Sequence, residues 1–151
     1  MADSIPAAKN SVWPYVLVAF LSLVGLGDAI YLTVQDLTGQ NLRCTIITGC
    51  AEVLASKWSH VAGVPLAALG AAAYFAVFSL GILIAFGYSV ARPLLQVLIA
   101  IMFLMTLWLL YLQALVIRHF CQYCLLSAAV TTVIVVIVVF ASLARRRVHA
   151  G

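Results

Sequence analysis

The stretch that decides the fold is Cys121-Gln-Tyr-Cys-Leu-Leu-Ser-Ala-Ala-Val-Thr-Thr-Val-Ile-Val-Val-Ile-Val-Val-Phe-Ala-Ser-Leu143. Its length reaches the roughly 20 residues that a helix needs to cross the hydrocarbon core of a bilayer. Val and Ile are β-branched, but a segment in lipid must satisfy all its backbone groups internally, which favours a helix. Arg145-Arg146-Arg147 follow and would anchor the helix end at a membrane surface. The stretch therefore predicts a membrane-spanning helix that begins with two cysteines.

Three further apolar runs precede it, at about 14–34, 64–86 and 93–117. The first run is longer than a signal-peptide h-region of about 7–15 residues and lacks a small-residue cleavage site, so we interpret it as a membrane helix. The composition agrees, because 66% of residues are hydrophobic and 8% charged, against about 25% charged in soluble domains. The sequence predicts an all-α, integral membrane four-helix transmembrane bundle, with residues 1–151 forming a single domain.

The basic residues predict the orientation of this bundle. Four spans place both termini on one side, together with five cationic residues, against three on the other side, namely Lys9, Arg92 and Arg145–Arg147 against Arg43, Lys57 and Arg118. The positive-inside rule then makes the termini cytoplasmic and puts the loop at about 35–62 outside. The net charge of +4 is not gathered along one face, so no nucleic-acid partner is indicated.

All four cysteines lie on the predicted outer face. Cys121-x-x-Cys124 places two thiols about one helical turn apart, which allows a disulfide. The helix start favours a thiolate, and Arg118 just upstream would add to this effect. Cys44 and Cys50 lie in the outer loop, with Gly49 for flexibility and without a rigid helical frame. Because disulfide exchange proceeds by thiolate attack, the two pairs together predict a relay of electrons.

Two alternatives to a relay follow from the same cysteines. Static disulfides, or cysteines buried as small apolar residues, would make the chain a non-enzymatic, disulfide-stapled membrane scaffold. Four cysteines can also hold zinc, but the Cys44-x5-Cys50 spacing is longer than the usual two to about four residues between structural zinc ligands. We therefore predict no metal site.

The order of these features resembles the vitamin K epoxide reductase family, specifically its bacterial members that act in disulfide formation. The resemblance covers nearly the whole chain and is carried by four stretches: Cys44 with Cys50, Ser56-Lys-Trp-Ser59, Gly63-Val-Pro-Leu66 and Cys121-Gln-Tyr-Cys124. In the bacterial disulfide-forming membrane protein B, another four-helix quinone reductase, the CxxC motif lies in the first outer loop. Here the motif follows the third apolar run, which favours the vitamin K epoxide reductase type.

The resemblance implies a role for each cysteine. Cys124 matches the cysteine nearest the quinone, and Cys121 matches its redox partner. Cys50 matches the loop cysteine that attacks Cys121, and Cys44 matches the one that exchanges with an outside protein. The implied enzyme is a thiol-disulfide:quinone oxidoreductase of the bacterial inner membrane. It would pass electrons from a thioredoxin-like protein, expected to be a separate chain, to ubiquinone or menaquinone, supporting disulfide formation in exported proteins.

The resemblance also implies a quinone pocket. Ser59 falls where relatives place a side chain that hydrogen-bonds a quinone carbonyl, although it is equally able to cap the second helix. Ser56 resembles a small polar residue near the same pocket, with loop hydrogen bonding as its alternative. Trp58 is expected to anchor at the membrane interface rather than to contact quinone. Ala128 stands where the animal enzymes carry a tyrosine, which favours plain quinone reduction over the alternative, vitamin K quinone or epoxide reduction.

Five further polar residues lie in or beside the spans. Asp28 is a functional candidate because an acid inside a membrane helix is costly, but we expect it to bond with polar groups of a neighbouring helix. His60 and His119 flank the proposed site and are able to assist proton movement, although plain interfacial histidines are the simpler interpretation. Gln96 and Gln113 are expected to join helices by hydrogen bonds.

Overall fold

The structure is a computed structural model that describes residues 6–39 and 49–150. It contains the long helices α1 (Pro6–Thr38), α3 (Leu66–Ala85), α4 (Ala91–Tyr111) and α5 (Gln122–Ala150). A π-helical segment, η1 (Leu112–Ile117), continues α4. Between α1 and α3 lie a short helix, α2 (Cys50–Leu54), and the strands β1 (His60–Val61) and β2 (Val64–Pro65).

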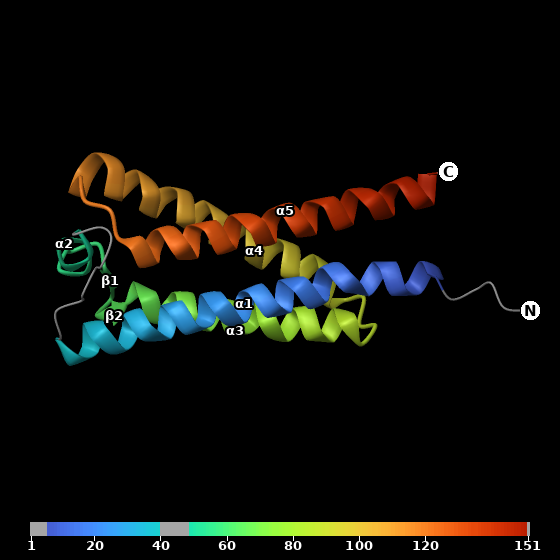
Figure 1. The fold of residues 1–151 in the computed structure, drawn as a ribbon, viewed down its shortest axis with the longest axis horizontal. Helices are drawn as coiled ribbons and strands as arrows, with labels where there is room; N and C mark the ends of the chain where they lie inside the picture. The colour runs from blue at the N-terminus through green and yellow to red at the C-terminus, as the bar shows by residue number, and fades with distance from the viewer. Residues whose placement is uncertain (1–5, 40–48, 151) are drawn as a thin grey trace, which may run out of the picture.

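The described residues include four helical stretches that are long and apolar enough to cross a membrane, Val12–Thr38, Leu66–Ala85, Ala91–Ile117 and Gln122–Arg147. The predicted all-α membrane bundle is therefore confirmed. Helix α1 packs against α3 and α5, and α4 packs against the same two helices. Figure 1 shows the start of α1 and the end of α5 at one end of the bundle, with α2 and the two strands at the other.

The core of the bundle is made mainly of small and branched aliphatic side chains, together with the rings of Tyr15 and Tyr74. Tyr74 of α3 is buried, and its ring lies so close to Gly25 of α1 that a Cβ at residue 25 would overlap it. The Tyr74 hydroxyl lies 2.7 Å from Ser127 Oγ and 2.8 Å from Thr131 Oγ1, both on α5. A single buried residue thus ties α1, α3 and α5 together, because a polar group in an apolar core needs a partner.

The ends of the elements differ from the sequence-based expectation at two helices. Helix α1 begins at Pro6 rather than near residue 14, and α5 continues to Ala150 rather than ending near residue 143. The apolar pattern marks only the part of a helix that lies in lipid, whereas the helical hydrogen bonds continue into the polar flanks. Arginines near the end of α5 also suit the negative end of the helix dipole.

A small hairpin precedes the second span and was not predicted. Its strands pair His60 with Pro65 and Val61 with Val64. The turn residues Ala62 and Gly63 have φ angles of 52° and 81°, and two successive positive φ values are the requirement of a tight type I′ turn. Because Val64 and Pro65 belong to the hairpin, α3 begins at Leu66, two residues later than expected.

Candidate active site

The thiol pair lies at the start of α5. Cys121 is fully buried, Cys124 is partly buried, and both are free thiols. A hydrogen bond from the Cys124 side chain lowers the pKa of Cys121 to about 7, and the backbone N–H groups of Cys124 and Tyr123 add to this effect, while burial opposes it. The expected thiolate at the helix start therefore falls on Cys121. These hydrogen bonds, and not the exposed Arg118, stabilise it.

Gln113 holds this helix start in place. It lies in η1, where the wider π-helical turn shifts side chains relative to a regular helix, and it is 2% exposed. The Gln113 Oε1 atom accepts a hydrogen bond of 3.1 Å from the Cys121 N–H, and the Gln113 side chain also hydrogen-bonds to Cys124. The expectation that Gln113 joins helices is confirmed. Its contacts with the Cys121 backbone and the Cys124 side chain were missed, although a glutamine within an apolar run just before a CxxC motif is a usable signal.

The segment between α1 and α3 brings a third cysteine to this pair. Cys50 is fully buried and packs in one cluster with Val53 and Cys121, bordered by Ile117 and Tyr123. It opens helix α2, so the expectation that the loop pair lacks a helical frame is wrong for this cysteine. Cys44 lies outside the described residues.

Gly49 has a different role from the flexibility expected of it. A Cβ at this residue would lie 2.7 Å from the carbonyl oxygen of Phe120 and 2.8 Å from the Cβ of His119. Only a glycine allows the start of α2 to approach this segment so closely. Gly49 therefore lets Cys50 pack beside Cys121.

A cavity of about 150 Å³ lies beside Cys124. Its wall is mainly apolar, with a few polar groups from α1, the loop before β1, η1 and α5, which is the usual character of a small-molecule site. The lining includes residues that the sequence singled out for various reasons, namely Asp28, Ser56, Trp58, Ser59, Gln113, Cys124 and Ala128, together with Asp36 and Ser127. The structure thus gathers these seven positions around one cavity.

The cavity has room for a ring. Apolar cavities of about 150 Å³ in proteins accept benzene, and the cavity here has that volume and an opening. Trp58 lines the cavity and is also 42% exposed, with Lys57 Nζ 5.4 Å from the centre of its ring. Trp58 thus forms part of the cavity wall and also part of the exposed surface of the protein.

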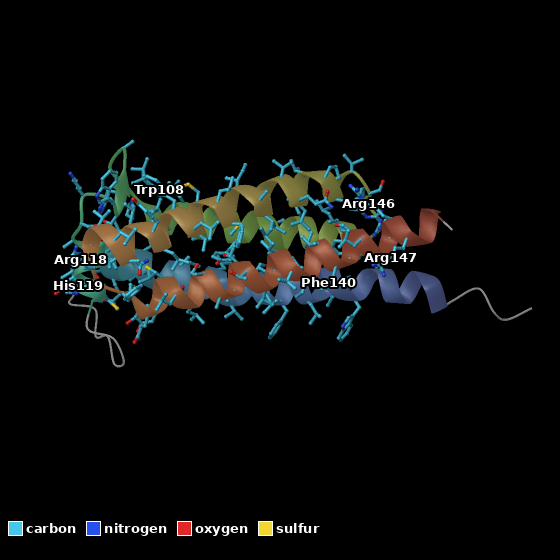
Figure 2. The ribbon with its side chains drawn as sticks, turned by 90° about the horizontal axis from the view of Figure 1, so that it is seen from above. Trp108, Arg118, His119, Phe140, Arg146 and Arg147 are labelled. Carbon is cyan, nitrogen blue, oxygen red and sulfur yellow. The ribbon has the colours of Figure 1, made fainter. Side chains whose placement is uncertain are left out.

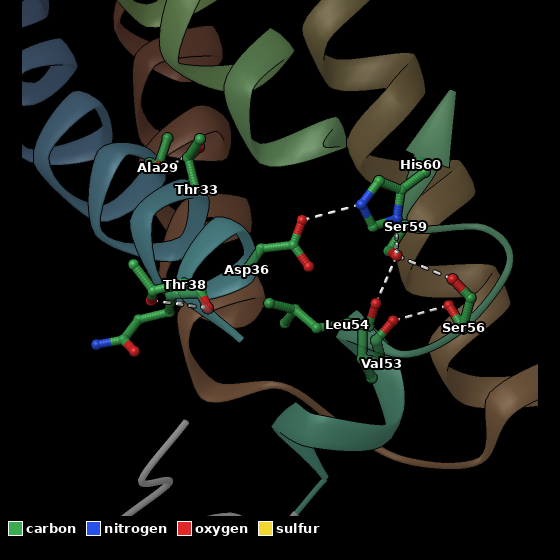
Figure 3. Close-up of polar contacts among 10 residues, drawn as sticks. Ala29, Thr33, Asp36, Thr38, Val53, Leu54, Ser56, Ser59 and His60 are labelled. Atoms are coloured by element: carbon green, nitrogen blue, oxygen red, sulfur yellow. Dashed lines mark hydrogen bonds and ion pairs between the residues drawn. The ribbon is translucent and has the colours of Figure 1, made fainter. Parts of the chain in front are cut away.

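The two loop serines have different hydrogen bonds (Figure 3). Ser56 Oγ donates to the carbonyl oxygen of Val53 at 2.7 Å, which is the loop bonding expected as its alternative role. Ser59 Oγ contacts the carbonyl oxygens of Leu54 and Ser56 and lies 2.8 Å from His60 Nδ1. The helix-cap interpretation of Ser59 is wrong, because Pro65 precedes α3 and no side chain caps it.

Asp28 also faces the cavity, from α1. It is 9% exposed, and its Oδ2 atom has no hydrogen-bond partner among the described residues. The expected bond between this oxygen and a neighbouring helix is therefore absent from the part of the chain that the structure describes. Gln96, by contrast, donates a hydrogen bond of 2.8 Å to Ser142 Oγ and joins α4 to α5 as expected.

Comparison with known protein families identifies the family to which this chain belongs. The model of the vitamin K epoxide reductase family matches residues 16–139, which include the four spans' apolar cores and all four cysteines. The chain belongs to the vitamin K epoxide reductase family. Members of this family are membrane oxidoreductases that take part in thiol redox chemistry and act on quinones. The cavity beside Cys124 is the place in this vitamin K epoxide reductase family member where a thiol and a ring-sized space meet.

Within the described residues, no group of three or more His, Cys, Asp or Glu side chains is arranged to hold a metal ion. The two free thiols and buried Cys50 instead lie against one another and against apolar side chains. The arrangement of the described residues suits exchange between sulfur atoms.

Proposed function

We propose that this protein is a thiol-disulfide:quinone oxidoreductase that supports disulfide formation in exported proteins. Electrons would pass from a separate thioredoxin-like protein to Cys44/Cys50, then to Cys121/Cys124, and finally to ubiquinone or menaquinone. One observation carries the proposal: Cys124 lines the ring-sized cavity while its side chain hydrogen-bonds to Cys121. The same thiol pair thus contacts both the cavity and the buried loop cysteine, Cys50.

The transfer to the acceptor starts from the reduced pair. The Cys121 thiolate is the nucleophilic sulfur, and Cys124 is the sulfur that faces the cavity. Formation of the Cys121–Cys124 disulfide releases two electrons and two protons, which is what conversion of a quinone to a quinol requires. The apolar wall would exclude water and hold the ring beside Cys124, and Ser59 would donate a hydrogen bond to a ring oxygen.

The oxidised Cys121/Cys124 pair is then reduced again by disulfide exchange. Once the thioredoxin-like protein has reduced the Cys44/Cys50 pair, a Cys50 thiolate attacks Cys121 of the Cys121–Cys124 disulfide, forming a mixed disulfide and releasing Cys124. Cys44 then attacks Cys50, which frees the reduced Cys121/Cys124 pair and leaves a Cys44–Cys50 disulfide. The thioredoxin-like protein reduces that disulfide and is itself oxidised. The packing of Cys50 against Cys121 supports the first of these steps.

The charge distribution supports an inner-membrane orientation with the cysteines outside. Figure 2 shows Arg146 and Arg147 at one end of the bundle and Arg118 and His119 at the other. The end that carries Arg92 and the arginines of α5 would face the cytoplasm by the positive-inside rule. The thiols would then face the bacterial periplasm, an oxidising compartment that suits disulfide chemistry.

Quinone reduction by the purified protein with a dithiol donor tests the proposal. The unaltered chain should reduce the quinone, and Cys124→Ala should lose this activity. Cys50→Ala should fail with a thioredoxin-like donor but still accept electrons from a small dithiol directly at Cys121/Cys124. Full activity of Cys124→Ala would contradict the proposal, and inactivity of the unaltered chain with every quinone would favour a membrane scaffold. Comparing quinone with vitamin K epoxide as acceptor distinguishes the proposed activity from epoxide reduction.

A further inference from the structure

Three side chains at the outer side of the cavity form a continuous chain of polar contacts (Figure 3). Asp36 Oδ2 lies 3.0 Å from His60 Nε2, and His60 Nδ1 lies 2.8 Å from Ser59 Oγ. Both ring nitrogens are thus engaged, one by a carboxylate and the other by a hydroxyl. The carboxylate accepts the Nε2–H and fixes the ring, so Nδ1 is the nitrogen through which this histidine is able to pass a proton to the hydroxyl.

The two ends of this chain differ in their surroundings. Ser59 and Asp36 both line the cavity beside Cys124. The His60 side chain is 43% exposed, against 13% for the Asp36 side chain. The chain of contacts therefore connects a group that water reaches with a hydroxyl on the cavity wall.

The local fold fixes this geometry. His60 is the first residue of β1 and pairs with Pro65 of β2. The carbonyl oxygen of Ser59 accepts a hydrogen bond of 2.8 Å from the Leu66 N–H, which joins the loop to the start of α3. Asp36 comes from the last turns of α1, the helix that packs against α3. The end of α1 and the loop before β1 thus meet at one imidazole ring, and the start of α3 holds that loop in place.

We propose that Asp36, His60 and Ser59 form a proton relay from the outer face of the protein to the acceptor oxygen in the cavity. The inference rests on the proposed quinone reduction. Ser59 is the member that would touch the substrate, while His60 passes the proton and Asp36 orients the ring.

The proposed relay would supply a proton that quinol formation requires. A quinol carries two protons and two electrons more than its quinone, and the dithiol supplies both electrons. Because hydrogen bonds lower the pKa of Cys121 to about 7, this thiol is already deprotonated in part of the molecules at neutral pH. In those molecules a proton must reach the acceptor from elsewhere. Ser59 would donate its proton to the oxygen and regain one from His60 Nδ1. The ring would keep its Nε2–H on the Asp36 carboxylate and take a replacement proton from water at the outer face, so that no net charge remains.

His60 and His119 provide a matched test, because both are exposed histidines at the thiol end of the bundle. In the full-length purified protein with a dithiol donor, His60→Ala should slow quinol formation about 100-fold, the lower part of the usual range for general acid–base catalysis. Added imidazole should restore the rate in proportion to its concentration. His119→Ala should keep the unaltered rate.

Two further measurements separate a relay from a structural contact. His60→Gln can keep hydrogen bonds to both neighbours but cannot pass a proton, so it should fold with an unchanged melting temperature and still be slow. The reduction of the Cys121–Cys124 disulfide by a small dithiol, measured without quinone, should be unchanged in both His60 variants. The relay would be overturned if His60→Gln formed quinol at the unaltered rate. It would also be overturned if added imidazole failed to restore quinol formation by His60→Ala. Inactivity of the unaltered chain with every quinone would instead overturn the proposed function.

Discussion

The two halves of the bundle differ in the kinds of contact that hold them together. The half that contains the chain ends is held by apolar contacts such as those of Val18, Leu95 and Ile134, with one side-chain hydrogen bond between helices, Gln96 to Ser142, among its described residues. The thiol half contains a π-helical segment, a tight hairpin, two buried cysteines and the polar chain from Asp36 to Ser59. Irregular backbone and buried polar groups are concentrated where the chemistry is proposed, and regular packing supports them from the other half.

The hollows in the two halves sharpen this contrast. A groove of about 590 Å³ lies between α4 and α5 in the half with the chain ends, and it is lined by apolar side chains with Gln96, Ser142 and Arg146. The cavity beside Cys124 measures only about 150 Å³. The smaller space is the better candidate site because it is lined by a thiol and several polar groups, whereas the larger groove has no cysteine or acid in its wall.

The largest expected effect comes from removing the nucleophilic sulfur. Cys121→Ser should lower the rate of quinone reduction at least about 1000-fold, because residues that act as one unit lose nearly all activity together. Ser142→Ala, which removes a hydroxyl from the other half, should keep the rate. Steady-state quinone reduction by both purified variants measures this difference, and comparable losses would mean that the two halves are not functionally distinct.

The pH dependence of Cys121 is the next expected effect. Its pKa of about 7 lies below the ordinary thiol value of about 8.5, so its reactivity toward a small disulfide should rise through pH 7 and level off above it. Cys124→Ala removes the main hydrogen bond and should move the midpoint up to 8.5 or higher. At pH 7 the thiolate fraction then falls roughly 15-fold. An unchanged midpoint in Cys124→Ala would show that another group stabilises the thiolate.

Gln96 and Gln113 lie on the same continuous helix but in different halves of the bundle, so replacing each of them compares the two halves directly. Gln113→Leu leaves the buried Cys121 N–H without its acceptor and should cost about 1–3 kcal/mol of stability, with a slower quinone reduction because Cys124 loses a contact. Gln96→Leu breaks an exposed bond to Ser142 and should cost less than about 1 kcal/mol. Thermal unfolding and turnover of both variants test this. If Gln113→Leu and Gln96→Leu lost the same stability and the same activity, Gln113 would have no special role at the thiol pair.

The last expected effect is on stability alone and concerns two close-packed glycines. A Cβ at Gly49 would lie 2.7 Å from a backbone oxygen, whereas at Gly81, in the other half, the nearest atom, the carbonyl oxygen of Tyr15, would be 3.3 Å away. Gly49→Ala should destabilise the protein by about 1–3 kcal/mol through overpacking. Gly81→Ala should be near neutral, because a gain of about 0.5–1 kcal/mol in helix propensity offsets the tighter contact. Melting temperatures that fall equally would contradict this difference.

Several parts of the fold were predictable because the bilayer imposes them. Length and apolarity decide which segments span, so the four spans were found from composition alone, while the helix ends outside lipid at Pro6 and Ala150 were not. The expectations for Gln96 and Gln113 as links between helices were also confirmed. The roles of the four cysteines and of Ser56 and Ser59 remain predictions, supported by the position of Cys124 and both serines on one cavity wall.

The sequence by itself determined the membrane class, the number of spans and the family, because these depend on local apolarity and on the order of short motifs. Only the tertiary structure decided that Gly49 is a close-contact residue, that Gln113 contacts the Cys121 backbone and the Cys124 side chain, and that His60 joins Asp36 to Ser59. Each of these depends on how helices are rotated and where a turn places the next residue. Such geometry arises from the packing of distant segments, which no local pattern in the chain specifies.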